Sequence, residues 1–264
     1  MDDGRGADEE GLAQVNDMDL YEKTRKQLMI GIIGCLLYVC GDFLFSATGK
    51  GQTTEMLGMF TRVAYLDMST WRMVVSILCG FVGTLMYYMG FHRFYWLLRR
   101  HRTAEKHPAW MRIFHTAYIT GTVAWTWVHA MFMTDALVFR FVYQAYGDMQ
   151  QAADIANRVF YANAPGMAAA YILCDIGLSA AMIAIVWKGV IPLKSQAGRI
   201  LATMCNPIMC PGLVGNLLSL FPWPLNQLDH GTESFGHALV LMLGIILLKE
   251  MHRSGELHAG YEQE

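Results

Sequence analysis

Long apolar stretches alternate with short polar segments along most of the chain. An α-helix needs about 20 mainly apolar residues to cross the hydrocarbon core of a bilayer, and six stretches approach or reach that length. Backbone polar groups in hydrocarbon must be bonded within the segment, so each stretch is predicted to be helical; the alternating pattern of a barrel strand is not seen. The fifth stretch is interrupted by proline and the sixth is short. The six predicted spans are 28–47, 72–97, 112–133, 166–187, 198–221 and 234–249.

The composition strengthens this interpretation. Of the 264 residues, 54% are hydrophobic and 16% are charged, and the mean hydropathy is +0.29. A soluble domain carries about 25% charged residues. This balance excludes a disordered chain and a nucleic-acid-binding domain, and it argues against a soluble globular enzyme. We therefore expect an all-α integral membrane protein whose main partner is the lipid bilayer.

The positive charges favour one orientation of the predicted spans. When the N-terminus is placed in the cytoplasm, fifteen of the 20 Lys and Arg residues fall on the inner side. An excess of Lys and Arg in the cytoplasmic segments sets the orientation of membrane helices. We expect six transmembrane helices with both termini cytoplasmic, in the plasma (inner) membrane. The five outer residues are Lys50, Arg62, Arg72, Arg140 and Arg158.

The segments outside the spans are of two kinds. Residues 1–27 are acidic and lack the charged, apolar and small-residue regions of a cleavable signal peptide, so we expect a cytoplasmic tail. Residues 250–264 are predicted to form the second cytoplasmic tail. The outer connections 54–70 and 144–161 both show apolar residues at helical spacing with polar faces. This pattern predicts amphipathic helices lying on the outer interface.

Ionisable side chains occur inside the spans, although each costs about 2.5–3.5 kcal/mol to insert. At 1.5 Å per residue, Asp42 lies about 22 Å above the inner start of the first span, and Asp175 lies about 14 Å below the outer start of the fourth. His129 in the third span, His237 in the sixth and Asn216 in the fifth lie in the same outer half. We predict that these groups, from five helices, face one outward-opening polar cavity. The alternative is that each only bonds neighbouring helices together.

Helical spacing extends this candidate site. Tyr38 shares a helix face with Asp42, and Tyr171 shares one with Asp175. The pattern Tyr-x3-Asp-x3-Ser-Ala begins at both tyrosines, in the first and fourth spans. Two three-helix halves necessarily run in opposite directions, as in many transporters, so the pattern is compatible with an inverted repeat. Coincidence of a short motif is the alternative.

The fifth span carries an unusual local sequence, Cys205-Asn206-Pro207-Ile208-Met209-Cys210-Pro211-Gly212. Its two prolines remove backbone donors and free carbonyl groups one turn earlier. A broken helix in the membrane is tolerated where its polar groups line a cavity, as at transporter binding sites, although prolines also form plain kinks. We therefore add Asn206 to the candidate ligands. No metal site is predicted at Cys205 and Cys210, because other soft ligands are missing nearby.

Three dipeptide or tripeptide features carry a resemblance to a known group of proteins. They are Gly41-Asp42 in the first span, Trp71-Arg72 opening the second and Val128-His129-Ala130 late in the third. With these features the chain resembles a family of small, six-helix, bacterial-type membrane proteins of unknown function. The resemblance implies no particular activity.

Function is predicted from what the spans contain and what the chain lacks. No G-x-S-x-G, phosphate-binding glycine loop or H-E-x-x-H motif is present. Our leading hypothesis is a multi-pass protein that binds or moves a small solute or protons, with Asp42 and Asp175 as ligands or proton carriers and His129 and His237 as relays. One alternative is a membrane-embedded enzyme, metal-dependent or acid–base, acting on a lipid or isoprenoid-like substrate. The other is a scaffold or accessory subunit. The sequence identifies no cofactor, substrate or oligomeric state.

Overall fold

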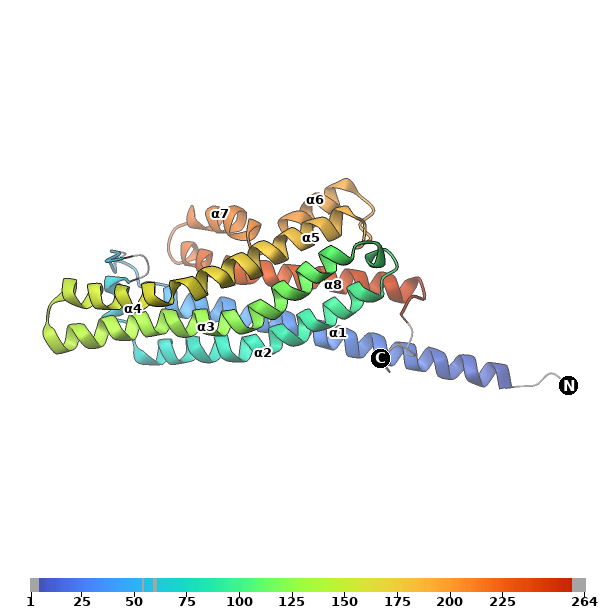
Figure 1. Cartoon of the computed structure of the whole chain (residues 1–264), viewed down its shortest axis with the longest axis horizontal. Helices are drawn as coiled ribbons and strands as arrows, with labels where there is room; N and C mark the ends of the chain where they lie inside the picture. Colours follow the sequence, from blue (N-terminus) through green and yellow to red (C-terminus); the bar gives the residue numbers. More distant parts are fainter. Residues whose placement is uncertain (1–4, 54, 59–60, 258–264) are drawn as a thin grey trace.

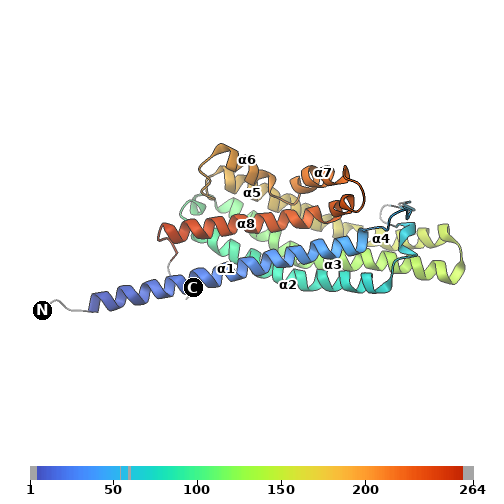
Figure 2. The same cartoon turned by 180° about the vertical axis from the view of Figure 1, so that it is seen from behind.

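The computed structural model describes residues 5–53, 55–58 and 61–257. This part of the chain is all-α and contains no β-strand, only one isolated bridge between Met56 and Arg62. Long helices run side by side along the molecule, and two short ones, α6 and α7, lie beside α5 and α8 (Figures 1 and 2). The helices are α1 (Arg5–Ser46), α2 (Thr70–Arg100), α3 (Pro108–Tyr146), α4 (Met149–Ala170), α5 (Gly177–Trp187), α6 (Gln196–Met204), α7 (Asn216–Ser219) and α8 (Thr232–Arg253).

Four helical segments are long and apolar enough to cross a membrane: Asp17–Ser46, Thr70–Arg100, Met149–Trp187 and Leu225–Arg253. They contain the first, second, fourth and sixth predicted spans. The third predicted span lies within the single helix α3, which also carries Arg112, Asp135 and Arg140 and is not among the four. The prediction of an all-α, membrane-type protein is therefore confirmed.

The fifth predicted span, 198–221, is not one continuous helix. Helix α6 ends at Met204, residues 205–208 are bends and turns, and the helix that follows is π-helical over Pro211–Gly215 before α7 begins at Asn216. The physical reason is the pair of prolines, which cannot donate backbone hydrogen bonds. The two short helices on either side of the break lie beside α5 and α8 (Figure 2).

The two connections expected to form interfacial helices differ from that prediction. Segment 54–70 is a loop with one 3₁₀ turn at Val63–Tyr65, and its residues 54 and 59–60 lie outside the described residues. Among its described apolar residues, Tyr65 and Met68 are buried in a cluster with Phe45, whereas Met56 is exposed. Segment 144–161 is mostly helical, as predicted, but it is not a separate helix: α3 ends at Tyr146, Gly147 turns the chain with a φ of 72°, and residues 149–161 are the first part of α4.

The two tails expected at the ends of the chain also differ in part. Helix α1 already begins at Arg5, so residues 5–27 continue the first span as helix. Helix α8 continues to Arg253, and residues 258–264 lie outside the described part.

Helices α1 and α2 pack closely through glycines. A Cβ atom placed on Gly31 would lie 2.5 Å from the Cα atom of Gly90. One turn further along, a Cβ atom on Gly34 would lie 2.8 Å from the carbonyl oxygen of Gly83. Small residues of this kind let membrane helices approach backbone to backbone. This contact fixes α1, and with it Asp42, against the rest of the bundle.

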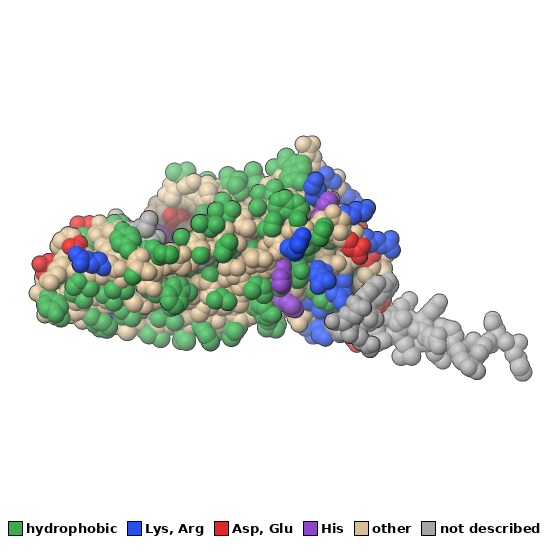
Figure 3. Space-filling view, in the orientation of Figure 1, with side chains coloured by type: hydrophobic (Ala, Val, Ile, Leu, Met, Phe, Trp, Pro, Cys, Tyr) green, Lys and Arg blue, Asp and Glu red, His purple; other side chains and the backbone are tan. Residues whose placement is uncertain are grey.

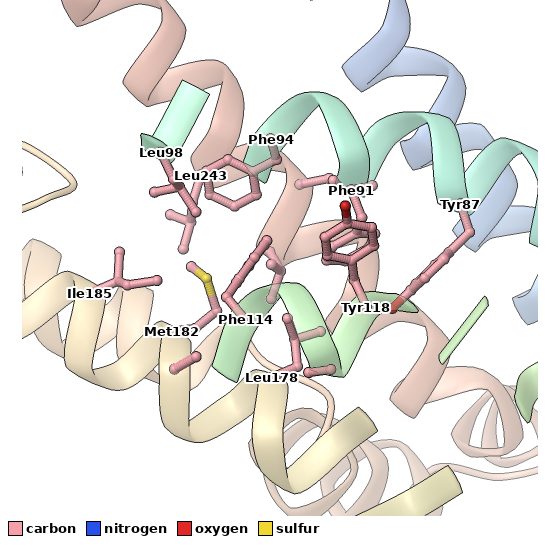
Figure 4. Close-up of a cluster of buried hydrophobic side chains, with 14 of the residues drawn as sticks. Tyr87, Phe91, Phe94, Leu98, Phe114, Tyr118, Leu178, Met182, Ile185 and Leu243 are labelled. Carbon is pink, nitrogen blue, oxygen red and sulfur yellow. The ribbon is translucent and has the colours of Figure 1, made fainter. Parts of the chain in front are cut away.

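Two apolar environments surround the polar interior. Inside the bundle, aromatic side chains of α2 and α3 interlock with aliphatic side chains of α5 and α8, as for Phe91, Phe114 and Leu178 (Figure 4). Outside it, large apolar side chains such as Phe81 and Leu85 on α2 are more than half exposed, and apolar side chains cover much of the visible surface (Figure 3). An apolar outer surface of this extent is what lipid contact requires.

Candidate functional site

A cavity of about 170 Å³ lies among α1, α3, α8 and the loop that precedes α2. It is large enough for several water molecules or one small solute. Ionisable side chains line it from several separate elements, so the cavity is polar inside an apolar bundle. These side chains are Asp42, Arg62, His129, His230, Glu233 and His237.

One carboxylate–imidazole pair bridges α1 and α3. The Oδ1 atom of Asp42 lies 3.9 Å from Nδ1 of His129. The other carboxylate oxygen, Oδ2, accepts a hydrogen bond of 2.8 Å from the Ser234 hydroxyl of α8. The ring of Tyr38 stacks on His129 with centroids 5.1 Å apart and an interplanar angle of 1°. Three helices thus hold this pair in one orientation.

A chain of hydroxyl groups fixes the tyrosine that supports the pair. Thr84 donates to the carbonyl of Gly80 over 2.9 Å, which leaves its oxygen free to accept from other hydroxyls. The Tyr38 hydroxyl donates to it over 2.6 Å, and the Thr126 hydroxyl over 3.0 Å. Gly80 also lets α2 approach the imidazole, because a Cβ atom there would lie 2.8 Å from Cγ of His129.

We expect Gly80→Ala to displace the His129 ring from Tyr38, since the added methyl group would overlap the imidazole. Overpacking of this kind costs about 1–3 kcal/mol and is relieved most cheaply by moving the ring. The stack on Tyr38 shifts the ring protons of His129 upfield, so histidine-selective NMR of the detergent-solubilised protein should show that shift lost. Gly177→Ala, which meets only an ordinary 3.4 Å contact, is the matched control. Unchanged His129 signals in Gly80→Ala would contradict the geometry.

A second ionisable cluster lies between the fourth predicted span and α8. Nε2 of His237 is 3.3 Å from Oδ1 of Asp175 and 3.9 Å from Sγ of Cys174. Consecutive side chains on an α-helix differ by 100°, but Tyr171–Ile176 forms a π-helical turn, and both Cys174 and Asp175 are buried. Gly121 of α3 leaves the space for the thiol. The three donor atoms lie within 4.8 Å of one another, so this cluster could hold a metal ion.

Glu233 connects the cavity to this cluster, and the sequence analysis missed it. It lines the cavity, and its carboxyl group lies beside that of Asp175. The signal that could have found Glu233 is its position four residues before His237, on the same face of α8. It lies one residue outside the predicted sixth span.

The loop before α2 supplies the mouth of the cavity. Arg62 donates to the Ser46 carbonyl over 3.4 Å, and an adjoining hollow of about 270 Å³ shares Ser46, Arg62 and His230 with the cavity. The loop is held by the Thr61 hydroxyl, which donates to Oδ2 of Asp135 over 3.0 Å. Burial raises the pKa of Asp135 to about 6, and the Thr61 hydrogen bond opposes that rise. Neither Arg62 nor His230 was among the candidate residues selected from the sequence.

The Trp71-Arg72 feature has a structural explanation. Arg72 donates to the carbonyl of Leu44 over 2.8 Å and to that of Ala47 over 2.6 Å, at the end of α1. A cation near the C-terminus of a helix satisfies its last carbonyl groups and complements the helix dipole. Trp71 is 60% exposed. Arg72 therefore ties the start of α2 to the end of α1, one turn beyond Asp42.

Six of the eight candidate residues lie in or beside the cavity, and two do not. Tyr38, Asp42, His129, Tyr171 and His237 line it, and Asp175 lies directly behind His237. The other two are Asn206 and Asn216.

The side chains of Asn206 and Asn216 are both hydrogen-bonded to the backbone of the broken helix. Oδ1 of the buried Asn206 accepts hydrogen bonds from the backbone N–H of Ile208 (3.0 Å) and of Met209 (2.9 Å). The exposed Asn216 donates to the Gly212 carbonyl over 2.7 Å. The backbone of Asn206 packs on Gly236 of α8, where an added Cβ atom would lie 2.6 Å from its carbonyl oxygen. The break is thus packed against protein, and neither side chain is among the cavity residues.

Comparison with known proteins gives a family and nothing closer. Residues 13–251 match a family model described as "Family of unknown function (DUF6796)". No curated protein and no solved structure matches the chain. The matched region includes every residue of the cavity and of the cluster behind it.

Proposed function

This chain belongs to that family of unknown function, as the resemblance of its first three spans predicted, and from its own geometry we propose that it is a multi-pass transporter that exchanges protons for a small polar solute. One observation carries the proposal. Asp42 and His129, from different helices, lie 3.9 Å apart in the wall of a polar cavity inside a bundle with an apolar outer surface. Ionisable groups at such positions typically mark a solute or proton pathway.

The proposed topology is six membrane crossings with both termini in the cytoplasm. Lys and Arg side chains gather at the end of the molecule where the first half of α1 emerges and α8 ends (Figures 1 and 3). The positive-inside rule assigns that end to the cytoplasm, which turns the Arg62 and His230 mouth outward. Helix α3 supplies the third crossing, and the broken segment from α6 to α7 supplies the fifth. We place the protein in the plasma (inner) membrane.

In this proposal, Asp42 and His129 couple the solute to the proton. A proton on either group changes the net charge of the cavity by one unit, and an imidazole changes its charge near physiological pH more readily than other side chains. A solute with hydrogen-bond donors or a positive charge competes with that proton for the Asp42 carboxylate. Binding of the solute then favours proton release, which is the linkage that an exchanger needs.

Two interrupted helical segments support a change between an outward-open and an inward-open state. The π-helical turn Tyr171–Ile176 interrupts the fourth crossing, and residues 205–215 interrupt the fifth. Interrupted helices of this kind surround the binding sites of many transporters. Tyr38 and Tyr171, which begin the two copies of the repeated motif, both line the cavity, and this supports two inverted three-helix halves.

A second candidate function follows from the cluster behind the cavity. Cys174, Asp175 and His237 offer a donor set for a metal ion, which favours a membrane-embedded, metal-dependent enzyme with a lipid or isoprenoid-like substrate. A scaffold or accessory role is the remaining alternative, and it predicts that the cavity residues affect only assembly.

The transport proposal is tested by reconstituting the purified protein in liposomes that contain a pH-sensitive dye. With a potassium diffusion potential imposed, we expect solute-dependent proton movement when pools of small amines, amino acids and sugars are added outside. Asp42→Asn should lower the rate at least about tenfold, because the amide cannot carry the proton. Asp154→Asn, on the exposed side of α4, is the matched control and should keep the full rate.

Two results would contradict transport. One is the absence of proton movement with every pool while the protein is folded and correctly inserted. The other is turnover of lipid by the protein in detergent, with no gradient present, which would favour the enzyme.

A further inference from the structure

Three buried side chains behind the cavity are not used by the proton exchange of Asp42 and His129. Cys174 and Asp175 come from the π-helical turn between α4 and α5, and His237 comes from α8. Each presents one potential ligand atom to the other two, and all three atoms lie within 4.8 Å of one another. The set combines a thiol, a carboxylate and an imidazole, so it is not a cluster of acidic groups.

The distances fit the edges of a tetrahedral site. Zinc binds histidine nitrogen and carboxylate oxygen at about 2.0–2.2 Å and thiolate sulfur at about 2.3 Å. Tetrahedral angles then separate nitrogen from oxygen by about 3.4 Å, and nitrogen from sulfur by about 3.6 Å. The separations from Nε2 of His237 are 3.3 Å to Oδ1 of Asp175 and 3.9 Å to Sγ of Cys174. A small change in the side-chain rotamers would bring the observed separations to those of a tetrahedral site.

The histidine is oriented as a ligand. Its Nδ1 atom lies 3.3 Å from the backbone carbonyl oxygen of Glu233. A carbonyl only accepts, so Nδ1 carries the proton, and the lone pair of Nε2 points to Asp175 and Cys174. Metal-bound histidines typically donate their second N–H to a carbonyl or a carboxylate in this way.

The carboxylate oxygen that faces this lone pair is unsatisfied. Oδ1 of Asp175 is buried and has no hydrogen-bond partner among the described residues. Nε2 of His237 can accept from the Cys174 thiol over 3.9 Å, whereas Oδ1 of Asp175 faces that nitrogen at 3.3 Å and receives no proton from it. An unsatisfied carboxylate oxygen at such depth is costly, and a bound cation removes that cost. This orphaned oxygen points to a ligand independently of the ligand spacing.

We infer that Cys174, Asp175 and His237 bind one divalent transition-metal ion, with Zn²⁺ as the best chemical match. The thiol excludes Mg²⁺ and Ca²⁺, which prefer oxygen ligands, and the mixed sulfur, nitrogen and oxygen set suits zinc. A thiolate, a carboxylate and a neutral imidazole neutralise two positive charges, so the loaded site has no net charge inside the membrane. Binding releases the Cys174 thiol proton to solvent.

Glu233 supports this site from the cavity side. Its carboxyl group lies beside that of Asp175, and its backbone carbonyl accepts from Nδ1 of His237 over 3.3 Å, so it helps to position two of the three ligands. The fourth coordination position is left to water or to a group entering from the cavity, as in zinc sites that keep an open position. The inference goes beyond the transport proposal and does not depend on it.

The test is equilibrium metal binding by the full chain in detergent, with no membrane gradient. Chelator-stripped protein is titrated with Zn²⁺ against a zinc-responsive dye, and with Co²⁺ while its absorbance is recorded. We expect one Zn²⁺ per chain and a Co²⁺–thiolate charge-transfer band. Asp175→Asn and His237→Gln should each weaken Zn²⁺ binding by about tenfold to a hundredfold or more. Cys174→Ser should abolish the band.

Cys210→Ser is the matched control, because Cys210 is buried but lies outside the cluster, and it should keep both affinity and band. If a variant fails to fold, a Zn²⁺-dependent rise in the thermal midpoint of the wild-type protein gives a second measurement. The inference is overturned if folded wild-type protein binds Zn²⁺ no more tightly than Cys174→Ser, or if Co²⁺ binds without the thiolate band. Metal binding without solute-dependent proton movement would count against the transport proposal alone.

Discussion

Replacing Gly90 with leucine is expected to leave the protein without a stable folded state in detergent. A Cβ atom at this position would lie 2.5 Å from the Cα atom of Gly31 and 3.1 Å from a methyl group of Leu241. Backbone atoms cannot move aside as a flexible side chain can, so α1 and α2 would have to separate. Their separation would remove the packing that holds Asp42 opposite His129.

Size-exclusion chromatography and thermal unfolding measure this effect. Gly90→Leu should give aggregated or unfolded protein, and Gly90→Ala should lower the thermal midpoint by about 3–10 °C, as overpacking by about 1–3 kcal/mol implies. Gly212→Ala is the matched control, because an added Cβ atom there meets open space. A Gly90→Ala variant as stable as Gly212→Ala would show that the two helices do not approach as described.

The second large effect is expected for Asn206→Leu, at the break between α6 and α7. The Asn206 amide oxygen accepts the N–H groups of Ile208 and Met209, and the Ser179 hydroxyl donates to it over 2.9 Å. Leucine would leave these donors buried without partners, at about 1–3 kcal/mol for each group. We expect a loss of several kcal/mol in the free energy of unfolding and early hydrogen exchange at residues 205–211.

Two further variants distinguish the role of Asn206 as a cap from a role as a ligand. Asn206→Asp keeps the accepting oxygen but loses the donation from Nδ2 to the Thr203 carbonyl and adds an ionisable group at a buried position, so it should retain only part of the stability that leucine loses. Asn216→Leu changes an exposed asparagine whose side chain donates to the Gly212 carbonyl of its own helical turn, and it should alter the free energy of unfolding by less than about 0.5 kcal/mol. Equal losses in Asn206→Leu and Asn216→Leu would contradict the capping role.

Hydropathy predicted the helices well where the surrounding medium decides the structure. The first, second, fourth and sixth spans lie in long apolar helices because each segment must satisfy its own backbone in lipid. The prediction of a helix over segment 54–70 was wrong because packing inside the protein, and not the surrounding medium, decides the structure there. Its regularly spaced apolar residues, such as Tyr65 and Met68, are buried against Phe45 and Met73 and not against an interface. Helical spacing alone does not distinguish these two kinds of burial.

The sequence selected some residues of the candidate site and missed others. The high cost of ionisable groups in hydrocarbon was enough to select Asp42, His129, Asp175 and His237. The same argument missed Glu233, which lies one residue outside the predicted span. Cys174 was missed because a regular helix would point it 100° away from Asp175, and the π-helical turn that brings both inside has no clear sequence signature.

The chain by itself determined that this is an all-α, membrane-type protein and which ionisable groups its interior must accommodate. Both follow from local free energies of transfer, which depend on residue type and on position within a span. Only the tertiary structure decided the partners: Asp42 with His129 in the cavity wall, and His237 with Asp175 and Cys174 next to it. Pairing depends on where helices touch and how each is rotated, and here contacts as close as Gly31 against Gly90 set that geometry.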